Sequence, residues 1–232
     1  MKGFLTTLVA GVLLSSSTAF AGLIPFSVDD GTAETSIGVN NGVTGSPFTW
    51  ANRFTNTSGG DLTLLDVSVA FGRLGGPPGA GAIGDAIDAA IFIDPTGSGD
   101  MTMASLAATW SLVGGVHSLD GMTFMTHVVP ALVTVPDGAD FYVGMIDRQS
   151  GLDGLIRFPA AEDTDSGSAG RSWAMFGGDL LDPSDPANII GTIDSFGLPG
   201  NWLIRATAIP APGALALIGV AGFLGGRRRR GT

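Results

Sequence analysis

Hydrophobic and polar residues alternate with a period of two along much of the chain. The clearest segment is 61–71, in which Val67, Val69 and Phe71 would point to one face and the residues between them to the other. Many short strands joined by Gly, Pro and Asp turns predict an all-β fold, an antiparallel, jelly-roll-like β-sandwich of about ten strands. Besides 61–71, the pattern predicts strands at 89–93, 106–112, 123–129, 133–135, 141–146, 155–158, 172–176, 189–193 and 202–207.

The first 21 residues depart from this pattern. Lys2 is followed by an apolar segment, 4–14, and then by Ala19-Phe20-Ala21, which has the Ala-x-Ala form of a cleavage site. This order is typical of a secretory signal peptide. We therefore expect a signal helix in 1–21, export through a translocase, and cleavage by signal peptidase that leaves Gly22 as the first residue.

The other end of the chain predicts a membrane segment. Pro210 and Pro212 prevent a helix from running out of the preceding domain. Residues 213–226 are then apolar or Gly, and as a helix they would span roughly 20 Å against a hydrocarbon core of about 30 Å. Arg227, Arg228, Arg229 and Arg230 follow and favour the cytoplasmic side, which places the body outside. A terminal helix packed on the domain is disfavoured because no face of the segment is polar.

This tail resembles the PEP-CTERM sorting signal, the substrate signal of exosortases in Gram-negative bacteria that make extracellular polysaccharide. The resemblance covers Pro210-Ala211-Pro212 with Gly213, the apolar helix and the arginine cluster, with Ala211 where the family motif has Glu. It implies a division into a signal peptide (1–21), a β-sandwich domain (22–208) and a sorting tail (209–232). It also implies an intermediate held in the inner membrane with its body in the periplasm, then cleavage by an exosortase-like enzyme and display at the cell surface or outside the cell.

The body carries a second, fainter resemblance. Asp29-Asp30-Gly31-Thr32 with Glu34, the strand at 61–71, Ile91 to Pro95, Tyr142-Val143-Gly144 and Arg171-Ser172-Trp173 are together similar to secreted bacterial β-sandwich domains of unassigned function. That resemblance implies a fold and no activity.

Charge and composition narrow the set of partners. Residues 22–208 contain six Arg, no Lys and all 21 acidic residues, for a net charge of −15. Such a surface repels phosphate groups, so we expect neither nucleic acid nor anionic lipid as a partner. The chain has no cysteine, which excludes disulfides and thiolate catalysis.

The best candidate for a metal site is a calcium loop. Asp94, Thr96, Ser98 and Asp100 place oxygen atoms at alternate positions of a Gly-containing loop, as hard cations require. The twelfth position from Asp94 is Ser105 rather than Glu, so the loop is not an EF-hand. Asp often caps turns without any ion, and solvated acidic turns are the alternative here and at the similar turns in 163–165 and 179–185.

Two further functions remain open. Trp50, Trp110, Trp173, Trp202 and Tyr142 offer aromatic rings for stacking on sugars, although tryptophans in such domains also fill cores. A secreted hydrolase is the other alternative, but no Gly-x-Ser-x-Gly motif occurs and no pair of carboxylates stands out. The sequence favours a non-enzymatic, surface-sorted protein without a catalytic residue, acting as a structural or adhesive component of the cell surface or of an extracellular polysaccharide matrix.

Overall fold

A computed structural model describes residues 22–39, 46–72, 86–112, 115–116, 118–148 and 158–211. The predicted signal peptide and the tail from Pro212 onward lie outside these ranges. Within them the only helices are two single 3₁₀ turns, η1 (Met101–Met103) and η2 (Ile193–Phe196). No helix of the described part is long and apolar enough to cross a membrane.

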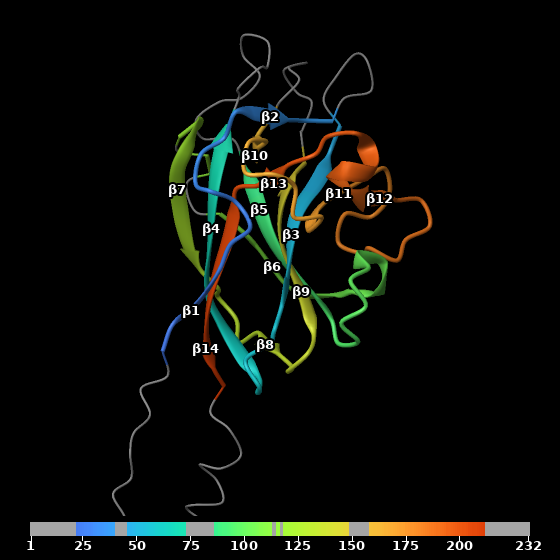
Figure 1. Cartoon of the computed structure of the whole chain (residues 1–232). Coiled ribbons are helices and arrows are strands. Elements are labelled where there is room, and N and C mark those ends of the chain that lie inside the picture. Colours follow the sequence, from blue (N-terminus) through green and yellow to red (C-terminus); the bar gives the residue numbers. More distant parts are fainter. Residues whose placement is uncertain are drawn as a thin grey trace, which may run out of the picture.

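The strands form two antiparallel sheets, which confirms the predicted all-β class and is consistent with a β-sandwich (Figure 1). The first sheet has eight strands and is built on the long strand β4 (Leu62–Gly72). The strands that pair directly with β4 are β14 (Ile204–Pro210), β10 (Ala160–Asp163), β7 (Asp120–Val128) and β8 (Thr134–Val135). β1 (Ile24–Phe26) pairs with β14, and both β13 (Asn201–Trp202) and β2 (Thr35–Ile37) pair with β10.

The second sheet has six strands in the order β12-β11-β3-β9-β5-β6. Its two central strands, β3 and β9, pair over eight residues. The strand bounds are β12 (Ile189–Thr192), β11 (Ser172–Phe176), β3 (Phe48–Thr55), β9 (Asp140–Asp147), β5 (Ile87–Asp94) and β6 (Ser105–Ser111).

The main core lies between the sheets because alternate residues of each strand point inward. Trp50, Phe141 and Trp202 fill it together with Val67 and Phe71 of β4. A second apolar cluster covers the outer face of the six-stranded sheet and includes Phe92, Tyr142 and Met175, with Met101 of η1 and Leu180 packed over them.

One polar side chain crosses the main core. Asn52 of β3 is fully buried, and its Nδ2 donates hydrogen bonds to the carbonyl oxygens of Trp202 (2.7 Å) and Ile204 (2.9 Å) in the opposite sheet. Its Oδ1 accepts a bond of 2.7 Å from the hydroxyl of Ser172, which in turn accepts a bond from the Trp202 backbone N–H. The amide is therefore satisfied entirely within the protein and ties the two sheets together.

Strands β1, β2 and β3 were not among the predicted strands, and the count of about ten is too low. Of these, β3 is a central strand; it alternates Phe48, Trp50 and Phe54 on its inner face, but the polar Asn52 interrupts the pattern. β10 was not predicted either, and the strand predicted at 155–158 falls largely outside the described residues.

The described chain begins and ends at the same end of the molecule, which we call the exit pole (Figure 1). Ile24 of β1 pairs with Ala208 of β14. β14 continues past the predicted domain boundary at 208, since Pro210 pairs with Leu62 and the Ala211 N–H donates to the carbonyl of Asp61 at 2.7 Å. Proline cannot donate to a ladder, and Pro210 lies beyond the last pair of β14 with β1, Ala208 with Ile24, where that edge of β14 has no neighbouring strand among the described residues.

Candidate functional site

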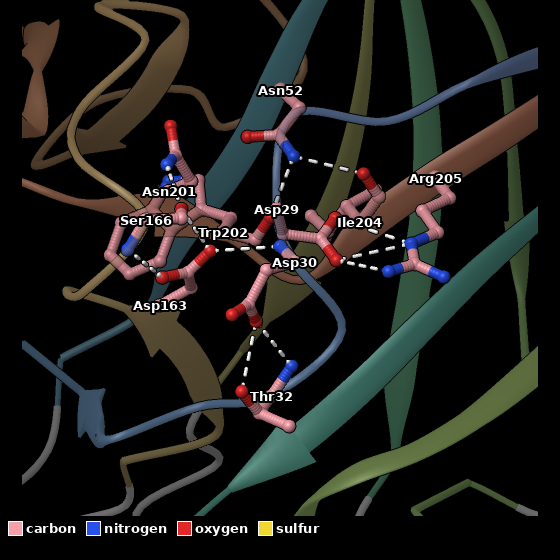
Figure 2. A network of polar contacts seen from close by, with 10 residues as sticks. All are labelled: Asp29, Asp30, Thr32, Asn52, Asp163, Ser166, Asn201, Trp202, Ile204 and Arg205. Carbon is pink, nitrogen blue, oxygen red and sulfur yellow. Dashed lines mark hydrogen bonds and ion pairs between the residues drawn. The ribbon is translucent and has the colours of Figure 1, made fainter.

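The most elaborate polar network joins the turn after β1 to the end of β10 and to β13 and β14 (Figure 2). It begins with Asp29, whose fully buried carboxylate accepts hydrogen bonds from Arg205 of β14, at 2.5 Å from Nη2 and 3.1 Å from Nε. The Arg205 guanidinium also lies 4.1 Å from the ring centre of Phe124 on β7, a cation–π contact. Burial raises the pKa of Asp29 above its ordinary value, although the hydrogen bonds and charge of Arg205 act in the opposite direction.

The turn that presents Asp29 depends on a glycine. Gly31 has a φ of +104°, which L side chains rarely adopt, and a Cβ at this position would lie 3.1 Å from Arg205 Nη2. Thr32 closes the turn by donating both its N–H and its hydroxyl to Asp30 Oδ1, each at 2.9 Å. The Asp-Asp-Gly-Thr motif noted in the sequence is therefore a turn that docks onto Arg205.

The second half of the network is centred on Asp163, the fully buried last residue of β10. One carboxylate oxygen accepts the Ser166 N–H (3.0 Å), and the other accepts the Ser166 hydroxyl and the N–H of Asp30 (2.9 Å). Burial raises the pKa of Asp163, but these hydrogen bonds outweigh burial and hold the pKa below its usual value. Asp163 is consequently a carboxylate that joins two turns 133 residues apart.

Asn201 of β13 fixes the loop that follows Asp163. Its Nδ2 donates to the Gly167 carbonyl (2.7 Å) and to the Ser166 hydroxyl (3.2 Å), and its Oδ1 accepts the Ala169 N–H (3.0 Å). The side chain is fully buried. Because both Nδ2 and Oδ1 of Asn201 are bonded to the loop, the loop conformation depends on this residue of β13 as well as on the loop's own residues.

These turns bring several carboxylates together. Carboxylate oxygens of Asp30, Asp163 and Asp165 lie within 4.8 Å of one another, a spacing at which they could hold a metal ion. Glu34 lies close by and accepts the Thr164 N–H at 2.8 Å. The negative charge of Glu34 is the largest of the effects that raise the pKa of Asp165. The sequence showed the two Asp-rich turns separately, but nothing in their spacing indicated that they meet.

One further acidic residue lies under this network, on the inner face of β10. Glu162 is 2% exposed, and its Oε1 has no hydrogen-bond partner among the described residues. Gly200 lies directly against it, since a Cβ there would be 2.8 Å from Glu162 Oε1. Burial, together with the charges of Asp194 and Asp163, raises the pKa of Glu162 to about 7.

The predicted calcium loop is closed by hydrogen bonds between its own residues. Oδ1 of the buried Asp94 accepts the N–H (2.8 Å) and hydroxyl (2.6 Å) of Thr96, and Oδ2 accepts the N–H (2.7 Å) and hydroxyl (2.6 Å) of Ser98. Asp100 instead caps η1 by accepting from Thr102. Burial raises the pKa of Asp94. The hydrogen bonds from Ser98 and Thr96 outweigh burial and hold this pKa below its usual value. The Gly99 N–H also donates to Oδ2 of Asp140 on β9 at 2.8 Å, so the turn is stabilised without an ion by these bonds, and calcium binding here stays a prediction.

The five aromatic residues proposed for sugar stacking do not share one exposed face. Trp50, Trp202 and Tyr142 are buried. Trp110 is partly buried against the inter-sheet core, whereas Trp173 is partly buried against the cluster on the outer face of the six-stranded sheet, with its ring 6.0 Å from that of Tyr142.

The predicted sorting residues are only partly described. Gly22 is exposed at the start of the described chain, and Pro210 and Ala211 lie at its end. Ala19, Ala21, Pro212, Gly213 and Arg227 to Arg230 lie outside the described residues.

Comparisons with known proteins define the class at the level of fold. No family model and no curated protein matches the sequence. A solved structure of the clostridial cysteine protease Cwp84, a variant after propeptide cleavage, aligns with 82% of this chain and 40% of its own, with a TM-score of 0.52 and 15% identity. A structure of the cysteine protease and lectin-like domains of Cwp84, described as a surface-layer-associated protein of Clostridium difficile, aligns with 72% of this chain and 33% of its own, at a TM-score of 0.47 and 15% identity.

The likeness to the first structure extends to the fold alone. This chain spans about two fifths of that protein's length. It contains no cysteine, so it has no nucleophile of the kind that a cysteine protease uses. The class of protein is therefore a two-sheet antiparallel β domain, and its function has to be argued from its own residues.

Proposed function

We propose that this protein is an exported, non-enzymatic β-sandwich domain, jelly-roll-like in type, that is sorted to the cell surface through its C-terminal tail. On this proposal the chain is exported, held in the inner membrane by residues 213–226 with Arg227 to Arg230 on the cytoplasmic side, and then cut by an exosortase-like enzyme. The released domain serves as a structural or adhesive component of the cell surface or of an extracellular polysaccharide matrix.

The observation that carries the proposal is the position where β14 ends. Pro210 is still paired with Leu62, and the Ala211 N–H is still bonded to Asp61. The predicted sorting motif thus begins where the sheet stops, without a linker. A cut between Ala211 and Gly213 would separate the tail and leave every described strand intact.

The test is the intact mass and the terminal sequences of the mature protein from its native host. We expect an N-terminus at Gly22 and a C-terminus between Pro210 and Gly213. A mature protein that retains Arg230 would contradict processing of the tail and would leave a plain membrane-anchored protein.

Carbohydrate binding is the alternative function, and the structure narrows the residues that could serve it. Since three of the five aromatic residues are buried, stacking on a sugar would have to use Trp110 or Trp173. Binding to a glycan array that is lost in Trp173→Ala and retained in Trp110→Ala, or the reverse, would favour this alternative. Turnover of polysaccharide or ester substrates by the purified protein would instead favour a hydrolase.

A further inference from the structure

The exit pole carries the most exposed of the large apolar side chains in the described part of the protein. Leu23, Val128 and Leu132 are 68%, 76% and 81% exposed, against 58% or less for the other exposed large apolar residues. We call these three residues the exit-pole patch. Single exposed apolar residues are ordinary on protein surfaces, so their common location is the feature that needs an explanation.

The strand register places the three residues around the same part of β4. Leu23 precedes Ile24, which pairs with Ala208 and through it stands level with Leu64. Val128 pairs with Asp66 at the end of β7. Leu132 precedes Val133, whose carbonyl accepts the Leu64 N–H.

The patch faces away from the core. The chain neighbours Ile24, Val129 and Val133 pack against the inter-sheet core, so their side chains contribute to the core and not to the patch. Leu23 directly precedes β1 and Val128 ends β7, and these two strands are three spacings apart in the sheet, about 14 Å at roughly 4.8 Å per spacing. Three separated side chains on one end of a sheet suit a broad apolar surface better than a narrow groove.

The sequence that follows the described residues indicates what kind of apolar surface the patch contacts. Ala211 is the last described residue at this pole, and the apolar run begins at Gly213. If that run enters a bilayer, the exit pole is held within a few residues of it. We propose that the exit-pole patch rests in the interfacial layer of the same bilayer, with Leu23, Val128 and Leu132 in contact with lipid. This proposal rests on the membrane-held intermediate of the proposed function.

The charges at the pole define the lipid. Asp61 and Asp137 are exposed at the pole, where the Asp61 carbonyl accepts the Ala211 N–H, and the half-buried Asp66 is the partner of Val128. Between Arg205 and Arg227 the chain contains no Lys or Arg. A carboxylate-rich rim is repelled by anionic headgroups, so the contact should form with zwitterionic lipid and weaken as anionic lipid is added.

The test uses the mature chain, which begins at Gly22 once the predicted signal peptide is removed, in phosphatidylcholine vesicles. Because the protein has no cysteine, Leu132→Cys and Leu23→Cys each give a single site for an environment-sensitive fluorophore. Ile189→Cys is the matched control, since Ile189 is exposed but lies on β12, at the far edge of the other sheet. Vesicle flotation is measured first and reports the tail; the emission of the label and its quenching by spin-labelled lipid are measured next and report the patch.

We expect all three labelled proteins to float, and the labels at positions 132 and 23 to shift to the blue and to be quenched, while the label at 189 stays in water. Adding phosphatidylglycerol should reduce the quenching. Floating protein with a water-exposed label at 132 would overturn the patch proposal and leave the proposed function standing. Protein that does not float would overturn the membrane-held intermediate and the patch with it. A label that becomes shielded without vesicles as protein concentration rises would assign the patch to a second copy of the chain and overturn lipid contact.

Discussion

Asp94 and Asp163 occupy matching positions and yet organise the molecule differently. Each is the last residue of its strand, each is fully buried, and each accepts hydrogen bonds from the N–H and hydroxyl of a nearby Ser. Among the described residues, the hydrogen bonds to the Asp94 carboxylate come from residues two and four positions later. Asp163 also accepts the N–H of Asp30, 133 residues earlier, and lies among other carboxylates. The same local device therefore shapes one turn in the first case and joins distant segments in the second.

Removing each carboxylate should separate these two roles. We expect Asp163→Ala and Asp94→Ala each to lower the free energy of unfolding by about 3 kcal/mol, because buried donors lose a charged acceptor. The two variants should differ in which backbone amides exchange faster with solvent. Asp163→Ala should speed exchange at the Asp30 amide as well as at Ser166, whereas Asp94→Ala should affect only residues 96–98. Unchanged exchange at Asp30 in Asp163→Ala would mean that the long-range bond contributes nothing.

Glycines in the two loops provide a smaller and matched comparison. Gly97 and Gly167 have φ values of +63° and +79°, so alanine is strained at either. A Cβ at Gly97 would lie 2.4 Å from the carbonyl oxygen of Gly138, whereas none of the described atoms lies within 4 Å of a Cβ at Gly167. In urea unfolding, Gly167→Ala should cost about 1 kcal/mol from strain and Gly97→Ala about 2 to 3 kcal/mol from strain and overlap. Equal costs would show that the 94–100 loop can move away.

The pH dependence of stability should have opposite signs for Asp163 and its neighbour Glu162. The pKa of Asp163 is lowered in the fold, so its contribution is present above its unfolded pKa and is lost as the pH falls through the lowered value. The pKa of Glu162 is raised from 4.5 to about 7, so its contribution is complete below pH 4.5 and is lost as the pH rises through about 7. Wild type should therefore become less stable between pH 5 and pH 8.

Glu162→Gln should remove that loss on the alkaline side, measured as urea midpoints at several pH values. Asp66→Asn, which removes a carboxylate from a half-buried position on β4, is the control and should keep the wild-type slope. A Gln variant with the wild-type slope would assign the pH dependence to another group.

Added calcium should have the smallest effect on stability, and its effect on two variants would show where an ion binds. If the predicted site in the 94–100 loop binds, millimolar calcium raises the melting temperature through binding to the folded state. That rise should be lost in Asp100→Asn and kept in Asp165→Asn. The reverse result would place the ion among Asp30, Asp163 and Asp165, and an unchanged melting temperature in wild type would exclude both.

The sequence predicted the elements whose signal is local. The strand at 61–71 and the turn at Asp94 were found because alternation and Asp–Ser spacing are visible within about ten residues. β3 was missed because Asn52 occupies an inward position that a local pattern reserves for an apolar residue, while its partners are carbonyls of the other sheet. The meeting of Asp30 with Asp163 could not be predicted, since it depends on β2 and β10 pairing across more than 120 residues.

The bonds made by Asn52 have a consequence for how the two sheets can be assembled. Apolar burial is non-directional, so by itself it specifies the alignment of two sheets less strictly than hydrogen bonds do. The hydrogen bonds of Asn52 are directional, because its Nδ2 must meet the backbone carbonyls of Trp202 and Ile204. A displaced alignment would leave these buried donors without acceptors, which is costly. We therefore expect this single side chain to favour the one alignment of the sheets in which both bonds form. Replacing Asn52 by Leu would be expected to broaden the native state into an ensemble of alignments.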